Sequence, residues 1–268
     1  MEMGTVDDKN IMEEDQLLGT LSVEDWITVE AVRSSFESVF QGSMVHPSVS
    51  SFNLSSPTTA LLSWSDRAGS TVLRVIDFFR QVNEFQSLPI DDRLILIKFN
   101  ISSVTAIFKC YAYKFASEHS SLDDFFRESS EYAGFFTLLN ASPDVYNGFM
   151  NLISSVFQNT DGNPTVLSLL LVILILTPGL SMNENQPPLN DPLAVNRVQS
   201  HYTKILWNYL VYQLGEMEAC KRFIQLQGII SRMQLSSNIL RRFIKDQCVK
   251  SNTVDKLEPM MQSFLHVS

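Results

Sequence analysis

Hydrophobic residues recur every three or four positions along most of the chain, which is the spacing of one face of an α-helix. The first such stretch begins at Ser22, where Ser22 and Asp25 resemble a helix cap, and it ends before Gly42. The pattern resumes at Asp66 and predicts helices over most of the remaining chain. These predicted helices cover 66–87, 91–113, a segment from Pro143, a segment from Pro164 up to Pro178, 192–212, 217–249 and 260–265.

Four of these predicted helices have the same chemical start, a capping side chain directly followed by proline. Proline suits the first position of a helix because its missing N–H has no partner within the helix there. Gly215 is expected to end the helix before it, since glycine is the usual residue at a helix C-terminus. The four starts are Ser142-Pro143, Asn163-Pro164, Asp191-Pro192 and Glu258-Pro259.

Alternating strand patterns are nearly absent, apart from a possible short hairpin between Tyr113 and Phe136. Residues 42–65 carry eight serines and two prolines, so we expect a flexible loop at about 42–63. The predicted fold is all-α, a three-layer antiparallel helical sandwich of about ten to twelve helices with at most that hairpin. We expect one domain over residues 21–268, preceded by a disordered acidic leader at 1–20.

The net charge of the chain and the length of its apolar runs argue against a DNA-binding protein and against a membrane-spanning protein. The net charge is −9, and the first 20 residues hold six acidic residues against one lysine, a net −5. Because there is no dense run of Lys and Arg, we expect no direct DNA binding by this chain. The longest apolar stretch, Val166 to Leu176, is far below the roughly 20 residues of a transmembrane helix. No secretory signal begins the sequence, so an intracellular protein is expected.

The sequence gives no sign of catalysis or metal binding. A nucleophile elbow, a glycine-rich phosphate loop, a zinc-protease motif and a dinucleotide-binding turn are all missing from the sequence. The four histidines and three cysteines are scattered, whereas a metal site needs clustered ligands. We therefore expect no enzyme, no cofactor and no metal, with an enzyme kept only as a third alternative. These residues are His46, His119, His201, His266, Cys110, Cys220 and Cys248.

One segment stands out as an ordered set, the stretch from Phe78 to Lys98. It combines aromatic residues and Arg80 with Phe85, Leu88-Pro89, two aspartates and a run of Leu and Ile. This order resembles the signature of nuclear receptor ligand-binding domains, although Phe79 and Arg93 depart from the usual residues. The resemblance extends in helix order and spacing over residues 21–268. It implies a ligand-regulated transcription module that acts in the nucleus, with the cytoplasm as an alternative second location.

The resemblance also implies a surface groove for a coactivator or corepressor helix. Ile76 and Arg80 share one helix face, and Leu94, Ile97 and Lys98 share a face of the next helix. If the turn at Phe85 folds these helices together, they form an apolar groove edged by cations, which suits a short amphipathic helix. Without the resemblance, ordinary core packing would be the better interpretation. The full predicted set is Ile76, Arg80, Phe85, Leu94, Ile97, Lys98, Met260, Met261 and Phe264.

The C-terminal segment Met260 to Leu265 resembles the activation helix of the family, with one departure. Ser263 stands where that helix carries a glutamate that would cap the N-terminal N–H groups of a partner helix. Its absence predicts coactivator binding weaker by about 1–2 kcal/mol. We expect weak or absent ligand-dependent activation, with a bias toward corepressors or transcriptional silence as the alternatives.

A pocket of the family type implies a lipophilic small-molecule ligand, not identified by the sequence. The candidate lining residues are mostly apolar with few polar anchors, as in other lipophilic sites. The 18 phenylalanines also allow a pocket filled by side chains. In that alternative the protein is a ligand-independent dimerisation or sequestering protein. The candidates are Trp64, Arg67, Ala68, Thr71, Val72, Val75, Val104, Thr105 and Phe108.

The long penultimate helix is where relatives of this family dimerise, so a homodimer or a retinoid X receptor-like heterodimer is implied. Some of its apolar residues must be core, because so long a helix has an inner face. Family members also carry an upstream zinc module with eight cysteines, which three scattered cysteines cannot build. The candidate interface is Phe223, Ile230, Arg232, Met233 and Arg241.

Overall fold

The computed structural model describes residues 21–41, 52–119, 122–182 and 185–267, with side chains left out at 105, 113 and 122–129 and over 115–119. This part of the chain is all-α and holds no strand. Its helices are α2 (Val23–Gln41), α3 (Pro57–Phe79), α4 (Asn83–Gln86), α5 (Ile90–His119), α6 (Leu122–Leu138), α7 (Pro143–Thr160), α8 (Pro164–Ile175), α9 (Pro192–Leu214), α10 (Glu216–Lys250), the short 3-10 helix η1 (Val254–Lys256) and α11 (Pro259–Leu265).

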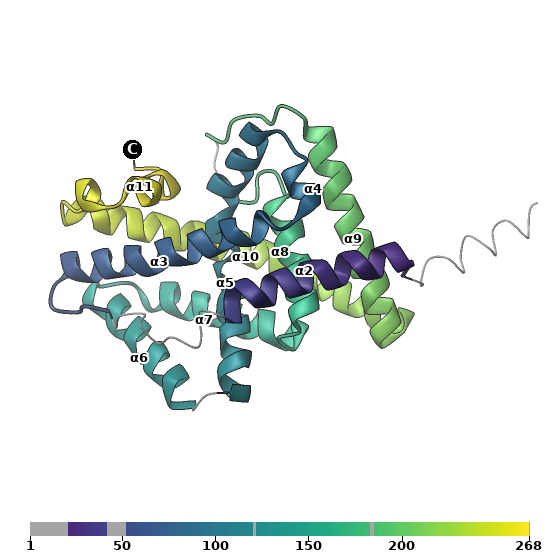
Figure 1. Cartoon of the computed structure of the whole chain (residues 1–268). Helices are drawn as coiled ribbons and strands as arrows, with labels where there is room; N and C mark the ends of the chain where they lie inside the picture. Colours follow the sequence, from purple (N-terminus) through teal and green to yellow (C-terminus); the bar gives the residue numbers. More distant parts are fainter. Residues whose placement is uncertain (1–20, 42–51, 120–121, 183–184, 268) are drawn as a thin grey trace, which may run out of the picture.

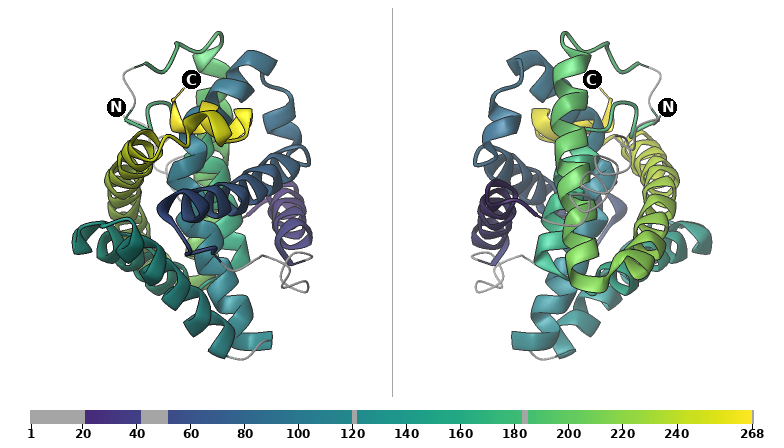
Figure 2. Two further views of the ribbon diagram at one scale, coloured as in Figure 1. Left: turned by 90° about the vertical axis from the view of Figure 1, so that its left-hand side faces the viewer. Right: turned by 90° about the vertical axis from the view of Figure 1, so that its right-hand side faces the viewer.

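The helices pack in layers around α5 and α8 (Figures 1 and 2). On one side α2 crosses α8 and α3 crosses α5, while on the other side α7 and α10 pack against each other and against α5. Helix α9 packs against α8 and α10, and the short α11 packs against α3, α5 and α10. The prediction of an all-α fold is therefore confirmed.

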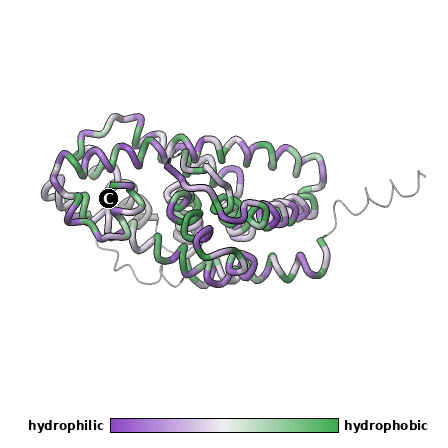
Figure 3. The backbone as a smooth tube through the Cα atoms, turned by 90° about the horizontal axis from the view of Figure 1, so that it is seen from above, coloured by the Kyte–Doolittle hydropathy of each residue, from purple (hydrophilic) through white to green (hydrophobic). Residues whose placement is uncertain are grey.

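The centre of this arrangement is α8. Every residue from Thr165 to Ile175 is buried, because other helices cover α8 on all sides. Burial on all sides explains why the residues of α8 are apolar around the whole helix and not on one face alone. The longer helices behave differently, since hydrophobic and hydrophilic residues alternate along them (Figure 3).

Capping hydrogen bonds confirm two of the four predicted starts before proline, while α7 and α11 begin at the predicted prolines without a capping hydrogen bond from the side chain of Ser142 or Glu258. The side chain of Asn163 accepts hydrogen bonds from the backbone N–H groups of Thr165 and Val166. Asp191 accepts one from Ala194 at 2.9 Å, and Gly215 has the positive φ of 75° that favours glycine. These local signals were readable in the sequence because capping needs only a few neighbouring residues.

Two predictions about irregular segments are wrong. Residues 57–63 are not loop but the first turns of α3, which a capping box between Ser56 and Thr59 begins. The hairpin between Tyr113 and Phe136 is also replaced by helix, because α5 continues to His119 and α6 starts at Leu122. The predicted acidic leader at 1–20 and residues 42–51 of the predicted loop lie outside the described residues.

A few buried polar contacts fix α9 to the rest of the molecule. The carboxylate of Asp92, which has no exposed surface, accepts hydrogen bonds from the backbone N–H groups of Asn190 and Asp191 at 2.6 and 2.8 Å. The hydroxyl of Tyr202 donates to Glu84 at 2.7 Å. The segment that carries the signature residues is therefore tied directly to the start of α9.

None of the described helices is by itself long and apolar enough to cross a membrane. By length and composition alone, Ile90–Val104 and Ala106–Ala112 meet the requirement together, but they are bent by 53° relative to each other. The most apolar helix, α8, has 12 residues.

Candidate functional site

A rigid corner joins α3 to α5. The rings of Phe79 and Phe85 lie 4.6 Å apart, and Phe85 is almost completely buried. The side-chain amide of Gln86 donates to the carbonyl of Phe79 at 2.8 Å, and Arg93 donates to the Gln86 side chain in turn. These contacts hold the first turn of α5 at a fixed position relative to the end of α3. Phe85 thus lies beneath the corner and supports it.

The end of α3 presents an apolar stripe that finishes in a cation. Leu73 is 53% exposed, and Ile76 is half-buried against the main core. Arg80 continues the same face, since positions separated by three or four residues lie above one another on a helix. Its guanidinium is exposed and pairs with Asp77 at 2.9 Å. Leu73 was not predicted, although its spacing from Ile76 is the signal that could have identified it.

The start of α5 presents a second stripe of the same kind. Ile90 and Leu94 are 63% and 62% exposed, and Ile97 is half-buried against the main core. Lys98 continues this face, with its ammonium 5.8 Å from the ring of Phe99. The predicted residues of this helix therefore share one accessible face, to which the structure adds Ile90.

The C-terminal helix α11 is docked against the body of the molecule. Met261 and Leu265 are buried, while Met260 and Phe264 are half-buried. Helix α11 approaches α3 closely at Gly69. A Cβ atom added to Gly69 would lie 3.5 Å from the terminal carbon of Met260. The helix also packs against α5 and α10.

The end of α11 is surrounded by cations. The ring of His266 stacks on Phe99 with centroids 4.8 Å apart, and its carbonyl accepts a hydrogen bond from Lys245 at 2.7 Å. Burial of the imidazole, together with the charges of Arg241, Lys98 and Lys245, lowers the pKa of His266 to about 4. The docked position of α11 therefore favours a neutral imidazole.

Because α3, α5 and α11 contact one another in pairs, their exposed and half-buried apolar residues form a neighbouring set. We refer to this set as the α3–α5–α11 surface. Its two ends carry the cations Arg80 and Lys98, and Ser263 occupies a half-buried position on α11. It comprises Leu73, Ile76, Arg80, Ile90, Leu94, Ile97, Lys98, Met260 and Phe264.

Four of the predicted ligand-lining residues lie within the main core. Val72, Val75 and Val104 are buried, and the ring of Phe108 lies 4.5 Å from that of Phe40. Other aromatic side chains occupy the surrounding space, including Phe36, Phe78 and Tyr111. The structure thus packs these four residues against protein side chains.

The other predicted ligand-lining residues lie elsewhere. Trp64 and Ala68 pack against a second core cluster beneath α11. Arg67 forms an ion pair with Glu131 at 3.1 Å and lies over the ring of Phe52 at 4.6 Å. Thr71 donates its hydroxyl to the carbonyl of Arg67, and the side chain of Thr105 lies outside the description. The predicted set is therefore divided between two parts of the core.

The predicted dimer residues on α10 face in several directions. Met233 has no exposed surface, so it belongs to the core and cannot contact a partner. Arg241 points inward and donates to the carbonyl of Ser181 at 3.1 Å. Phe223 and Ile230 are half-buried, and Arg232 is exposed. Sequence reasoning missed the apolar residues of α10 that are exposed, namely Met217, Ile224, Leu235, Ile239 and Val249.

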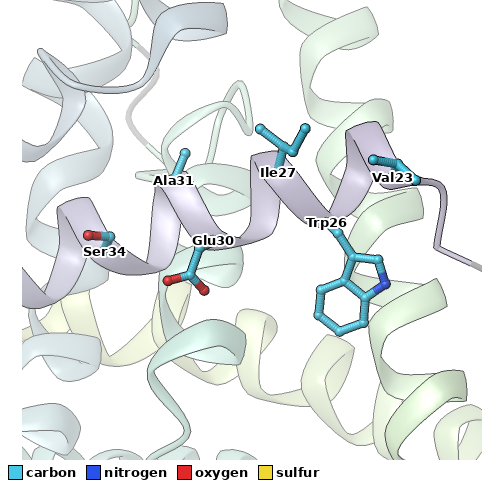
Figure 4. Close-up of a pocket in the computed structure, with 6 residues that line it drawn as sticks. All are labelled: Val23, Trp26, Ile27, Glu30, Ala31 and Ser34. Atoms are coloured by element: carbon cyan, nitrogen blue, oxygen red, sulfur yellow. The ribbon is translucent and has the colours of Figure 1, made fainter.

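Two surface depressions lie away from the α3–α5–α11 surface. The first, of about 660 Å³, is lined entirely by residues of α2 (Figure 4). There Trp26 points away from Ile27 and Ala31 and packs its ring edge-on against Tyr212 at 5.2 Å. The second lies between α9 and α10 and includes Phe223, the one residue that either depression shares with the predicted sites.

The described residues show little that resembles an active site. Cys110, Cys220 and Cys248 are free thiols, and burial raises the pKa of Cys110 to about 11, which leaves it protonated near neutral pH. In the described ranges no three His, Cys, Asp or Glu side chains come together as metal ligands.

No protein-family model and no curated protein matches this chain. The resemblance to nuclear receptor ligand-binding domains therefore depends on residues 78–98, on the segment that begins at Asp191 and on the order of the helices.

Proposed function

We propose that this protein is a transcriptional interaction module of the nuclear receptor type, whose α3–α5–α11 surface binds a short amphipathic helix of a coactivator or corepressor. The observation that carries the proposal is the pair of exposed apolar stripes on α3 and α5, joined at a rigid corner and each followed by a cation. Such a partner links the module to transcription in the nucleus.

The physical basis is burial of apolar surface together with helix-end electrostatics. A partner helix that covers Leu73, Leu94 and Ile97 removes apolar area from water, which contributes about 25 cal/mol per Å² before the cost of association. Arg80 is suited to the C-terminal carbonyl groups of that helix, where the helix dipole favours positive charge, whereas Lys98 lies at the other end of the surface, where its charge acts on His266 beside α11. This combination sets both the orientation and the length of the partner.

Ser263 bears on the kind of partner. It lies on α11, where a carboxylate would be suited to the partner's N-terminal N–H groups, but a serine supplies no charge. Coactivator helices that depend on such a contact should bind weakly. Corepressor helices that bind without it would be favoured.

Peptide binding tests this proposal. Fluorescence anisotropy with labelled LxxLL and corepressor-type helical peptides should show binding to the wild type, and Leu94→Arg should weaken it at least about tenfold because a charge then lies in the apolar contact. Leu193→Arg is the matched control, since Leu193 is similarly exposed at 68% on α9. No binding of either peptide, or equal loss in both variants, would contradict the proposal.

The role of Ser263 can be tested separately. Ser263→Glu should strengthen LxxLL-peptide binding by about 1–2 kcal/mol, a factor of roughly 5 to 30. Ser200→Glu, at an exposed position of α9, controls for the added charge and should have no such effect. An unchanged affinity for Ser263→Glu would remove the inference about coactivators.

A second candidate function is favoured by the packing of the main core. Because aromatic side chains surround Val72, Val75 and Phe108, the cavity expected for a lipophilic small molecule would be filled, and the protein would act as a ligand-independent dimerisation or sequestering partner of receptors. A homodimer and a retinoid X receptor-like heterodimer are the assemblies to test by sedimentation.

Mass spectrometry of the purified protein after organic extraction separates the two forms. A stoichiometric co-purified lipid, with a thermal shift on adding back that lipid, would support the ligand-regulated form. Absence of extracted lipid, and no shift with a panel of hydrophobic ligands, would support the ligand-independent form.

A further inference from the structure

Positive charge is concentrated at the end of the α3–α5–α11 surface that lies beside the last turn of α11. Lys98 of α5 is half-buried there, with its ammonium 5.8 Å from the ring of Phe99, on which His266 stacks at 4.8 Å. Arg241 and Lys245 lie one turn apart on α10, and both are half-buried. Lys245 donates to the carbonyl of His266 at 2.7 Å. We call Lys98, Arg241 and Lys245 the basic cluster.

The charge of the basic cluster is not balanced by a nearby carboxylate. None of its three side chains forms an ion pair within the described ranges, although each is partly removed from water. Arg241 donates to the carbonyl of Ser181 and to the side chain of Asn238, and neither acceptor is charged. Among the described residues, the charges that shift the pKa of His266 are these same three cations. In a chain of net charge −9, this end of the surface is a local exception.

The basic cluster and Arg80 lie at opposite ends of the surface. Arg80 follows α3 at the corner, and Ile90 begins α5 on the other side of that corner. Lys98 lies eight residues after Ile90, which is a rise of about 12 Å along α5. A partner helix of about eight residues has the same length. Its C-terminal carbonyl groups are suited to Arg80, so its N-terminus points toward the basic cluster.

This direction brings two positive charges together unless the partner supplies a negative one. The N-terminus of a helix carries a partial positive charge of about half an elementary charge. Ser263 on α11 supplies no carboxylate between that N-terminus and the basic cluster. Like charges that face each other weaken binding, whereas a partner carboxylate at this position is attracted both to the cluster and to its own helix dipole.

We propose that the basic cluster selects partner helices that carry acidic residues in, or directly before, their first turn. The proposal rests on the proposed function and specifies the chemistry of the partner helix. Lys98 is the cation that contacts these acidic side chains, because it shares a face of α5 with Leu94 and has no hydrogen-bond acceptor among the described residues. Arg241 and Lys245 already donate to backbone carbonyls, so they mainly add to the positive potential.

The size of the expected effect follows from ion pairs at partly exposed positions. One such pair changes affinity by at most about fivefold, and salt weakens it. The net charge of the whole protein acts in the opposite direction, because −9 attracts basic peptides over longer distances. A preference for acidic peptides would therefore report the local charge of the basic cluster.

Fluorescence anisotropy of the full-length protein with three LxxLL peptides tests the proposal. The peptides differ only in the two residues before the first leucine, which are Asp-Glu, Asn-Gln or Lys-Lys. At low ionic strength the acidic peptide should bind about fivefold tighter than the neutral peptide, and the basic peptide should bind more weakly than both. High salt should reduce these differences.

A substitution of Lys98 separates its contact from effects within the peptide, because acidic residues also stabilise the free peptide helix. Lys98→Gln should reduce the preference for the acidic over the neutral peptide to about twofold or less. Lys204→Gln removes the same charge from an exposed position of α9 and should keep the wild-type preference. A melting curve followed by circular dichroism checks that both variants are folded.

The possible results distinguish this proposal from the proposed function. Equal binding of the three peptides, or the same preference in Lys98→Gln as in the wild type, would overturn the role of the basic cluster and leave the α3–α5–α11 surface as a binding site. Tighter binding of the basic peptide would also overturn it, because overall charge would then govern binding. Failure of all three peptides to bind would contradict the proposed function itself, together with this inference.

Discussion

The main core around α8 and the second core cluster beneath α11 are built differently. The main core takes buried residues from α2, α3, α5, α7, α8, α9 and α10. The second cluster is smaller and combines Phe52, the start of α3, the end of α6, the end of α10 and α11. Met260 and Phe264 pack against both, so α11 lies where the two meet.

The two regions should differ in how easily they open locally. Helix α8 is covered on every side, whereas α11 has seven residues and buries only Met261 and Leu265. Elements with few buried contacts open locally at a lower free energy than the core around them. The proposed partner-binding surface therefore includes a strongly held pair of helices, α3 and α5, and a weakly held one, α11.

The largest effect should follow a truncation in the main core. Leu170 is 1% exposed within α8, so Leu170→Ala should reduce the free energy of unfolding by about 2–5 kcal/mol through lost burial and the cavity left behind. Urea denaturation followed by circular dichroism measures this change. The control Leu193→Ala, at an exposed site, should change it by less than about 0.5 kcal/mol. A similarly small effect at Leu170 would show that α8 is not the tightly packed centre.

A truncation in α11 should separate local from global stability. Leu265→Ala should destabilise docking of α11 by about 2–3 kcal/mol, and hydrogen exchange of amides 260–265 should accelerate accordingly. The urea midpoint of the whole molecule should move much less, because α11 opens before the main core unfolds. Loss of global stability equal to that of Leu170→Ala would show that the two regions form one cooperative unit.

Acidification should act on α11 through His266. Because its pKa is lowered to about 4, mainly by burial and then by Arg241, Lys98 and Lys245, the docked state favours the neutral ring. The neutral ring contributes fully to the stability of the docked state above the ordinary histidine pKa of about 6.5. This contribution is lost as the pH falls toward 4, and the loss is roughly 1–2 kcal/mol after solvent screening.

Hydrogen exchange of amides 260–265 at pH 7.5 and pH 5, corrected for intrinsic rates, measures this loss. His266→Gln cannot take up the proton and should remove most of the pH dependence while keeping a polar side chain. If the variant and the wild type respond to pH in the same way, His266 does not control the docking of α11.

The smallest effect is expected for the exposed ion pair between Arg80 and Asp77. Both side chains are more than half exposed, so Asp77→Asn should change the free energy of unfolding by less than about 0.5 kcal/mol. It should nevertheless leave Arg80 freer to meet a partner helix, and peptide affinity should stay equal or rise slightly. A marked loss of stability would show that the pair supports the corner between α3 and α5.

The helix boundaries could be predicted wherever local chemistry decides them. Capping residues followed by Pro143, Pro164, Pro192 and Pro259 identify four helix starts correctly. The hairpin predicted from the clustered serines and aromatics between Tyr113 and Phe136 is wrong, because α6 is an amphipathic helix. Its residues Phe135 and Phe136 are buried in the second cluster.

Part of the candidate site could also be predicted, because local spacing along a helix decides which residues share a face. The spacing of Ile76 with Arg80, and of Leu94 with Lys98, places each pair on one helix face from the sequence alone. Whether such a face is buried depends on distant segments, so Met233 could not be distinguished from an exposed residue of α10. The proximity of α11 to α3 and α5 likewise depends on tertiary packing.

Mapping where an amphipathic helical peptide binds tests the proposed role of the α3–α5–α11 surface most directly. Hydrogen exchange of the full-length protein should be measured with and without a saturating LxxLL or corepressor-type peptide. Slower exchange confined to residues 73–80, 90–98 and 260–265 is the predicted result. Protection centred on α9 and α10, or no protection at any concentration, would contradict the assignment of the α3–α5–α11 surface as the binding site.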